Sequence, residues 1–306
     1  MTPLVLDCDP GHDDAVALLL AGATDRLRAV TTVGGNQVVE KCTLNALRVL
    51  SMSGLDVPVA EGAPKPLVRP LRIADDVHGV SGLDGPEWPE PVVDPDPRGA
   101  AELLRRTLVE SEEPVVVLAT GPLTNVAALL LAHPEVAERI AEISWMGGST
   151  GRGNVTPFAE FNAAVAPEAA RVVFDSGVPV TMCGLDVTHQ ALVTEDVVAR
   201  LRPLPLGDVL VELMTFFGST YRRIYGFEAP PLHDLVAVAR VLDPTLVQSV
   251  RVNVEVETSG DWTTGATVVD LTGYTGRTPN ADVALHLDVP RFWALVLDVL
   301  AAFPVG

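Results

Sequence analysis

The sequence predicts an α/β fold with a Rossmann-like, mostly parallel sheet flanked by helices. Two observations predict it. Short apolar segments alternate with helix-like stretches along all 306 residues, and a composition of 48% hydrophobic and 20% charged residues is typical of a folded protein. Such alternation builds βαβ units, in which successive strands lie parallel. We find no linker-like segment and no internal repeat, so we expect a single domain over residues 1–306.

Each expected strand is a short apolar run that ends at glycine, proline or polar residues. The expected strands of the main sheet cover residues 3–6, 27–33, 57–60, 114–119, 143–146, 178–183 and 283–287. The expected helices cover residues 13–23, 38–53, 99–110, 121–131, 167–176, 194–201, 207–224, 232–242 and 291–303.

Two further segments depart from this alternation. Residues 247–258 and 263–270 alternate apolar and polar side chains, which predicts a small antiparallel hairpin. Residues 64–97 are so rich in proline that we expect a long loop without regular structure. Long loops in compact domains are often functional, so this loop is a candidate part of a site.

The charge balance and the cysteine content exclude several classes of protein. Lys and Arg number 21 against 40 Asp and Glu, a net charge of −19 that argues against nucleic acid or an anionic membrane surface as the partner. The three cysteines, Cys8, Cys42 and Cys183, are widely spaced and form no disulfide or metal-knuckle pattern. No apolar run is long enough for a membrane span, and no leader signature is visible, so we expect a cytoplasmic protein.

An aspartate cluster lies where the first expected strand ends and the first helix begins. Asp7, Asp9, Asp13 and Asp14 fall within eight residues, at the sheet edge where open α/β folds bind ligands. Helix capping explains one aspartate, but the mutual repulsion of four is costly without a cation. Oxygen donors without cysteine or paired histidine favour a hard cation, Ca²⁺ or Mg²⁺. The turn lacks the G-x-G-x-x-G pattern of a dinucleotide site.

The same segment, LDCDPGHDDAVA, resembles the N-terminal signature of the inosine-uridine preferring nucleoside hydrolases. Further matches follow in the family's order: VGGN at 33–36, HGVSGLDG at 78–85, ATGPLTN at 119–125, WMGG at 145–148, NVTPFAEFN at 154–162 and LHD at 232–234. The resemblance implies the nucleoside-hydrolase fold, one Ca²⁺ per subunit and a homo-oligomer, dimer or tetramer. The implied activity is hydrolysis of the N-glycosidic bond of purine or pyrimidine ribonucleosides to free base and ribose, in nucleoside catabolism and salvage.

The resemblance also assigns the metal site and the hydrolytic residues. It implies that Ca²⁺ is held by Asp9, by Asp14, by the main-chain carbonyl of Thr120 and by Asp234. Asp9 would take the proton of the attacking water. Asp13 would bind the ribose 2′-hydroxyl, and Asn36, which follows a Gly-Gly turn, would bind the water or the same hydroxyl.

One loop is expected to bind the remainder of the sugar. The resemblance assigns Asn154 and Glu160 to the 5′-hydroxyl and Asn162 to the other ribose hydroxyls. Met146 ends an apolar strand, as a core residue would, and in the family lies against the sugar. Phe161 lies between two of these ligands and is expected to flank the base.

The base side of the site is expected to come from histidines and tyrosines. His233, next to Asp234, matches the family histidine that faces the leaving base, where a proton donor is needed. His78 matches a second family histidine, in the proline-rich loop that we expect to close over the substrate. Tyr221 and Tyr225 lie four residues apart, which predicts one helix face, either a packed stripe or a contact to the base. His12, His133, His189 and His286 receive no role.

Two other functions remain open at this stage. One is hydrolysis of another N-ribosyl compound, and the other is nucleoside binding without turnover. The presence of Asp9, Asp13, Asn36 and His233 favours the enzyme. The preference for purine or pyrimidine is not predicted.

Overall fold

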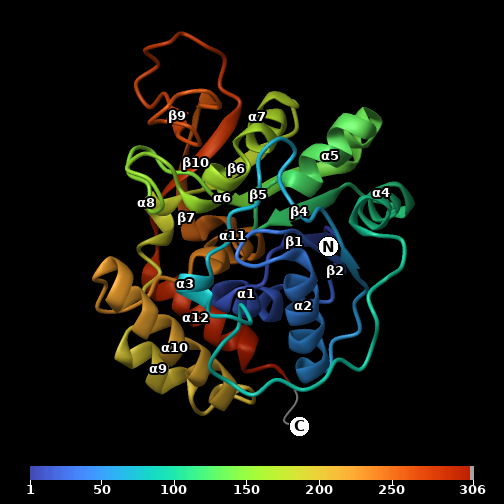
Figure 1. Ribbon diagram of the computed structural model, residues 1–306, viewed down its shortest axis with the longest axis vertical. Coiled ribbons are helices and arrows are strands. Elements are labelled where there is room, and N and C mark those ends of the chain that lie inside the picture. Colours follow the sequence, from blue (N-terminus) through green and yellow to red (C-terminus); the bar gives the residue numbers. More distant parts are fainter. Residues whose placement is uncertain (304–306) are drawn as a thin grey trace.

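An eight-stranded sheet forms the centre of the computed structural model, which describes residues 1–303 (Figure 1). The strand order is β3-β2-β1-β4-β5-β6-β10-β7, and every neighbouring pair is parallel except β10 and β7. The strands are β1 (Leu4–Cys8), β2 (Leu27–Thr32), β3 (Val59–Glu61), β4 (Val115–Ala119), β5 (Ile140–Met146), β6 (Val180–Cys183), β7 (Val247–Val252) and β10 (Ala281–Leu287). A second sheet pairs β8 (Val254–Val256) with β9 (Thr267–Val269) antiparallel. The predicted α/β class and mostly parallel sheet are confirmed.

Helices cover both faces of this sheet (Figure 1). They are α1 (His12–Gly22), α2 (Val39–Ser53), α3 (Asp75–His78), α4 (Ala100–Glu110), α5 (Thr124–Ala132), α6 (Phe161–Val165), α7 (Pro167–Asp175), α8 (Leu185–Thr188), α9 (Glu195–Leu201), α10 (Gly207–Tyr225), α11 (His233–Leu242) and α12 (Val289–Leu300). Two 3₁₀ turns, η1 (Pro134–Arg139) and η2 (Pro244–Leu246), precede β5 and β7.

Strand alternation divides the interior into two cores. Leu4, Leu6 and Cys8 pack with α1, α2 and the C-terminal helices on one face, whereas Val5 packs with α4, α5 and α7 on the other. Successive side chains of a strand point to opposite faces, so a strand buried on both sides is apolar throughout. This accounts for the continuous apolar runs in the sequence.

Two expectations for the loop and the hairpin are corrected. The segment 247–258 is not one arm of a hairpin: β7 joins the edge of the main sheet against β10, and only β8 pairs with β9. The break falls at Asn253, where the valines on both sides are buried and the alternation is lost. Within the proline-rich loop, the proline-free stretch between Pro70 and Pro86 forms the single helical turn α3.

The strand order places the functional end of the sheet. From β1, the chain proceeds through β2 and β3 to one side and through β4, β5 and β6 to the other. Such a reversal leaves a crevice beyond the carboxyl ends of the two central strands, β1 and β4. None of the helices within residues 1–303 is long and apolar enough to cross a membrane.

Candidate active site

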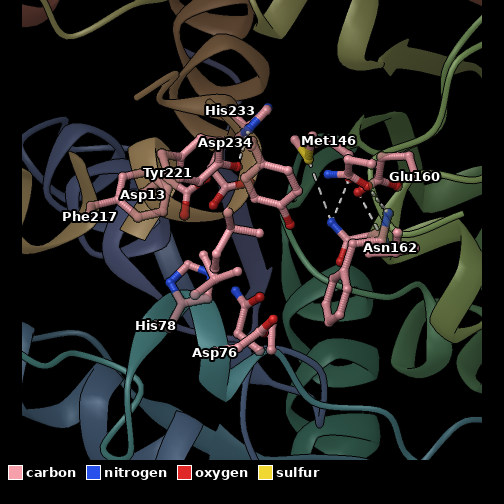
Figure 2. A pocket seen from close by; sticks show the side chains of 18 of the residues that line it. Asp13, Asp76, His78, Met146, Glu160, Asn162, Phe217, Tyr221, His233 and Asp234 are labelled. Carbon is pink, nitrogen blue, oxygen red and sulfur yellow. Dashed lines mark hydrogen bonds between the residues drawn. The ribbon is translucent and has the colours of Figure 1, made fainter. Parts of the chain in front are cut away.

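A cavity of about 200 Å³ opens at this reversal, beyond β1 and β4 (Figure 2). Its lining includes Asp13, Asn36, His78, Thr120, Met146, Asn154, Glu160, Phe161, Asn162, Tyr221, Tyr225, His233 and Asp234. The structure therefore gathers the residues predicted for the site, from segments far apart in the sequence. Asp9 and Asp14, the other two, are fully buried and do not line the cavity.

The carboxylate floor, which we define as Asp9, Asp13, Asp14 and Asp234, comes from the β1–α1 turn and the start of α11. Asp14 is fixed through both oxygens: Oδ2 accepts the main-chain N–H of Gly11 and the Asn36 amide, each at 3.0 Å, and Oδ1 accepts the Thr120 hydroxyl at 2.7 Å. The first turn of α1 is therefore held to the ends of β2 and β4.

Asp9 has one satisfied and one unsatisfied oxygen. Its Oδ2 accepts the main-chain N–H of Asn36 at 2.7 Å. Its Oδ1 is buried and has no hydrogen-bond partner among residues 1–303. A buried carboxylate oxygen without a partner is costly, so this atom is an acceptor for a group that binds in the site.

Glycines make room for Asp9. A Cβ on Gly35 would lie 2.0 Å from Asp9 Oδ2, and a Cβ on Gly121 would lie 2.6 Å from Asp9 Oδ1. We call Gly35 and Gly121 the glycine cradle. Both follow strand ends, in the VGGN and ATGPLTN motifs, and no larger residue fits there without moving the carboxylate.

The floor fits a hard cation. Asp13, Asp14 and Asp234 are buried, and one oxygen of each lies within 4.8 Å of the others. Burial and mutual repulsion raise the pKa of Asp13 to about 8, and they raise the pKa of Asp9 and of Asp234 well above the usual value. An all-oxygen donor set with an unpartnered oxygen beside it is what Ca²⁺ or Mg²⁺ requires. This group of three includes Asp13, which the resemblance assigned to the ribose 2′-hydroxyl and not to the metal, and Asp9 lies outside it.

Thr120 and Asn162 meet at the edge of the floor. The Asn162 side-chain N–H₂ donates to the main-chain carbonyl of Thr120 at 2.8 Å and to that of Met146 at 3.0 Å (Figure 2). Both donors of Asn162 are thereby used, and its Oδ1 has no partner among residues 1–303, so it is left as an acceptor beside the cavity.

Glu160 caps the short helix α6 and shapes the opposite side. Its carboxylate accepts the main-chain N–H groups of Gly148, Asn162 and Ala163 at 2.9–3.1 Å. Burial raises the pKa of Glu160 to about 7 despite these bonds. Asn154 accepts the main-chain N–H of Phe161 at 3.0 Å, which orients its amide.

The donor wall, which we define as His78, Tyr221, Tyr225 and His233, also lines the cavity, and Figure 2 shows His78, Tyr221 and His233 around it. His233 Nε2 lies 2.8 Å from the Tyr221 hydroxyl, and its Nδ1 lies 2.8 Å from the Thr188 hydroxyl. Burial lowers the pKa of His233 to about 3, so the ring is neutral at pH 7. If Nε2 carries the hydrogen and donates to Tyr221, the tyrosine hydroxyl hydrogen is free to point into the cavity.

The tyrosines form the packed stripe that their spacing predicts, and this stripe also lines the cavity. The rings of Tyr221 and Tyr225 are 4.9 Å apart, and Tyr221 also packs on Phe217 at 4.6 Å. Both tyrosines also line the cavity. A packed stripe and a cavity wall are therefore the same surface.

Several lining residues were not predicted individually. Arg72, Ile73, Ala74, Asp76 and Val77 come from the proline-rich loop around α3, while Phe217 and Ile224 come from α10. Phe217 lies one helical turn before Tyr221, so the four-residue spacing could have identified it. Thr188, the partner of His233, carries no sequence signal, because only the fold brings it to the ring.

The chain is similar to known proteins in both sequence and structure. A model of the family described as inosine-uridine preferring nucleoside hydrolase matches residues 4–294. The chain is 50% identical over 304 residues to the pyrimidine-specific ribonucleoside hydrolase RihA of Escherichia coli, an alignment that covers 97% of this chain and 98% of the relative. The structure of the present chain is similar to that of a purine-preferring ribonucleoside hydrolase from Gardnerella vaginalis. The TM-score is 0.91, and the two chains are 31% identical over 99% of both. It is also similar to an inosine-guanosine nucleoside hydrolase, with a TM-score of 0.90 and 28% identity over 98% of both chains. The expected fold is confirmed.

Proposed function

The chain belongs to the inosine-uridine preferring nucleoside hydrolase family, whose members cleave the N-glycosidic bond of ribonucleosides; from this premise we propose that it is a Ca²⁺-dependent hydrolase that prefers pyrimidine ribonucleosides. The observation that carries the proposal is that one cavity is lined both by buried carboxylates, Asp13 and Asp234, and by neutral hydrogen-bond donors, with Asp14 beside the carboxylates. The floor suits a ribose with a cation, and the wall suits a departing base.

The cation is proposed from the donor chemistry. Asp14 and Asp234, the Thr120 carbonyl and Asp9 would hold it, with Asp13 close enough to take part. A bound divalent cation favours the ionisation of water and gives the ribose hydroxyls an electrostatic partner. A set of carboxylate and carbonyl oxygens without nitrogen or sulfur suits Ca²⁺.

Asp9 is proposed as the general base. Its Oδ1 is buried and unpartnered, while its Oδ2 is fixed by the Asn36 main chain. Only Oδ1 is therefore available to accept the proton of a water that attacks the anomeric carbon. Asn36 donates to Asp9 through its main chain and to Asp14 through its side chain, so it fixes the position of one carboxylate relative to the other.

The ribose is proposed to bind across the floor. Asp13, Asp234 and Asn162 present acceptors where the 2′- and 3′-hydroxyls would lie, and Asn154 and Glu160 lie where the 5′-hydroxyl would reach. Phe161 and Met146 complete the sides of the cavity. Such a site rejects a sugar that lacks a hydroxyl, because the buried polar groups are then left unpaired.

The leaving base is proposed to receive its hydrogen bond from the Tyr221–His233 pair. His233 is neutral at pH 7, so it holds the Tyr221 hydroxyl rather than carrying a spare proton of its own. In the tautomer with its hydrogen on Nε2, His233 donates to that hydroxyl, and the hydroxyl hydrogen is free to point to the base, which needs a proton as its bond to the sugar breaks. Over the whole reaction, water adds its hydroxyl to the sugar and a proton to the base.

The preference for pyrimidines is proposed from the relatives. The chain shares 50% identity with a relative named as pyrimidine-specific, against 31% with one named as purine-preferring. A panel of uridine, cytidine, inosine, guanosine and adenosine, with release of free base and ribose measured, tests this directly. Faster cleavage of uridine and cytidine supports the proposal, whereas faster cleavage of inosine reverses the preference but keeps the chemistry.

Adding a binding measurement and other N-ribosyl compounds to this panel separates the two other functions. Binding of ribonucleosides without any release of base would identify a binding protein. Release from another N-ribosyl compound only would change the substrate. The proposed dimer or tetramer is tested separately by sedimentation of the full chain.

A further inference from the structure

The small sheet of β8 and β9 has no role in the proposed mechanism, yet it touches a segment that the mechanism uses. Thr267 is the first residue of β9, where it is buried and pairs with Val256 of β8. Its side chain lies against the turn that follows β5, at Gly148 and Ser149. The second sheet therefore reaches the edge of the site through one threonine.

The Thr267 hydroxyl holds both polar groups of the Ser149 main chain. The Ser149 N–H donates to Thr267 Oγ1 at 2.8 Å, and Thr267 Oγ1 donates to the Ser149 carbonyl at 2.6 Å. A main-chain N–H can only donate and a carbonyl can only accept, and a hydroxyl offers one hydrogen and free lone pairs, so both bonds form at once. Neighbouring antiparallel strands exchange two hydrogen bonds in the same way, but here one side chain makes both.

Gly148, the residue before Ser149, connects this contact to Glu160. Its φ is +73°, and a Cβ there would lie 2.8 Å from both Oγ1 and Cγ2 of Thr267, so the main chain of the turn rests directly on the threonine. The Gly148 N–H donates to Glu160 Oε2 at 2.9 Å, and its carbonyl accepts the N–H of Leu185 at 2.9 Å. The peptide groups on both sides of Gly148 are therefore fixed.

The turn that leads into β9 also contacts the helix that Glu160 caps. Gly265 lies two residues before Thr267 and has a φ of +86°. A Cβ at this position would lie 2.7 Å from the Cα of Ala164 and 3.1 Å from the Cβ of Ala159, on either side of Glu160 in the sequence. Both segments whose main-chain N–H groups bind the Glu160 carboxylate are therefore in contact with this hairpin.

We propose that Thr267 is a positioning residue for the 5′-hydroxyl side of the site: its hydroxyl fixes the turn after β5, so that the Gly148 N–H holds the Glu160 carboxylate where the ribose 5′-hydroxyl binds. The contact between Glu160 and the ribose rests on the proposed function. The connection from Thr267 to Glu160 rests only on contacts within the chain.

Two variants at position 267 separate the hydroxyl from the shape of the side chain. Thr267→Val keeps the branched shape and removes both hydrogen bonds to Ser149. Thr267→Ser keeps the hydroxyl and removes only the methyl group. Thr107→Val is the matched control, because Thr107 is a partly buried threonine of α4 that lies outside the cavity lining, and its hydroxyl donates to the Leu103 carbonyl at 2.8 Å.

The kinetic test compares uridine with 5′-deoxyuridine, which lacks the 5′-hydroxyl. For Thr267→Val we expect kcat/KM on uridine to fall about 10²-fold, as for a misplaced binding group. On 5′-deoxyuridine we expect a loss within about threefold, because the contact to the 5′-hydroxyl is not made there. Thr267→Ser and Thr107→Val should both resemble the wild type. Equal losses of Thr267→Val on both substrates, with a normal melting temperature, would overturn the positioning role.

A double variant tests whether Thr267 acts through Glu160. Glu160→Ala removes the carboxylate that Gly148 holds, so Thr267→Val combined with it should lose no more activity on uridine than Glu160→Ala alone. Additive losses would show that Thr267 acts on another part of the site, and they would overturn the proposal.

Amide hydrogen exchange gives a readout that needs no turnover. In the ¹⁵N-labelled wild-type chain, we expect the amides of Gly148 and Ser149 to exchange slowly and at the same rate, because one opening of the turn releases both. Both should exchange faster in Thr267→Val and stay slow in Thr267→Ser.

The outcomes of the exchange experiment separate this inference from the proposed function. Independent exchange of Gly148 and Ser149 in the wild type overturns the inference even if uridine is hydrolysed, and this comparison holds if Thr267→Val does not fold. Slow common exchange that is lost in Thr267→Val, in a chain that hydrolyses no ribonucleoside, leaves the connection to Gly148 standing and refutes the proposed function instead.

Discussion

Burial shifts the pKa values of the carboxylate floor and of the donor wall in opposite directions. Burial raises the pKa of Asp9, Asp13 and Asp234 and lowers the pKa of His78 and His233, so it pushes both regions toward neutrality. On the wall, His233 is neutral, and both of its ring nitrogens have hydrogen-bond partners. The floor has an unpartnered oxygen and close carboxylates, and it needs a cation to be ionised.

This difference shows which groups each of the two regions depends on. The wall is preset by contacts within the chain, such as those of His233 with Thr188 and Tyr221. The floor, by our proposal, is completed by a bound cation. Removing the cation should therefore disable the floor and leave the wall intact, whereas substitutions in the wall should depend on the leaving group.

Removal of the cation is the strongest test of this contrast. Exhaustive chelation should abolish hydrolysis of both uridine and nitrophenyl riboside, since the floor serves every substrate. Added Ca²⁺ should restore activity and raise the melting temperature, because a ligand of the folded state stabilises it. Full activity in a preparation shown by elemental analysis to contain no metal would contradict the proposed mechanism.

The sugar should be discriminated almost as strongly. We expect ribonucleosides to exceed 2′-deoxyribonucleosides by about 10³-fold or more in kcat/KM, because the missing hydroxyl leaves Asp13 and its neighbours unpaired. Rates on uridine and deoxyuridine measured side by side provide the check. Comparable values would show that the floor does not bind the 2′-hydroxyl.

The general base is tested by Asp9→Asn. This change keeps the Oδ2 contact to Asn36 possible and removes the proton acceptor, so kcat should fall about 10²-fold or more. Substrate affinity should change less. The bound metal must be measured in the variant, since Asp9 lies beside the cation site. A kcat close to normal would transfer the base role to another carboxylate, Asp13 first.

The wall is tested by the leaving group. His233→Ala releases the Tyr221 hydroxyl, so it should cost about 10² more on uridine or inosine than on nitrophenyl riboside, whose leaving group needs no proton. Tyr221→Phe should show the same selectivity with a smaller loss. If both substrates lose equally, His233 only shapes the cavity.

The smallest expected effect is on stability without the cation. Above about pH 7.5, histidines are largely neutral in both the folded and the unfolded chain, so the buried carboxyl groups and the buried thiols of Cys8, Cys42 and Cys183, whose pKa values are also raised, dominate the titration. Their folded pKa values are raised, about 8 for Asp13, so stability is present at lower pH and is lost as the pH rises through that value.

The size of this effect follows from the linkage. One such group changes the unfolding free energy by at most about 1.4 kcal/mol per pH unit, and the melting temperature by roughly 2–4 °C per kcal/mol. Melting curves of chelated protein between about pH 7 and about pH 8.5 should show this fall. Ca²⁺ should suppress it, and a melting temperature that rises with pH in chelated protein would contradict the raised pKa values.

The two regions also differed in how far the sequence could predict them. The floor was predicted because its members at positions 9, 13 and 14 lie within one turn of the chain, and their repulsion already implies a cation. Of the wall's residues, His78 and His233 were predicted through the family resemblance, and Tyr221 and Tyr225 through their four-residue spacing. The pairing of His233 with Thr188 was not predicted, because only the packing of α8 against α11 brings the two side chains together.

The two errors in the predicted fold each have a physical explanation. The alternation of residues 247–258 predicted a strand correctly but not its partner, since pairing depends on which strand edge is free. β10 offers such an edge to β7. In the proline-rich loop, the composition of the whole segment concealed the proline-free stretch that forms α3.

The glycine cradle around Asp9 has a consequence for redesigning base preference. A combinatorial library that varies the strand-end loops would consist largely of inactive members, because any side chain at Gly35 or Gly121 would collide with Asp9. The end of α10 is different. Ile224 and Tyr225 lie there, line the cavity and are only partly buried. Diversity concentrated there would explore new leaving groups while every member keeps the same hydrolytic apparatus.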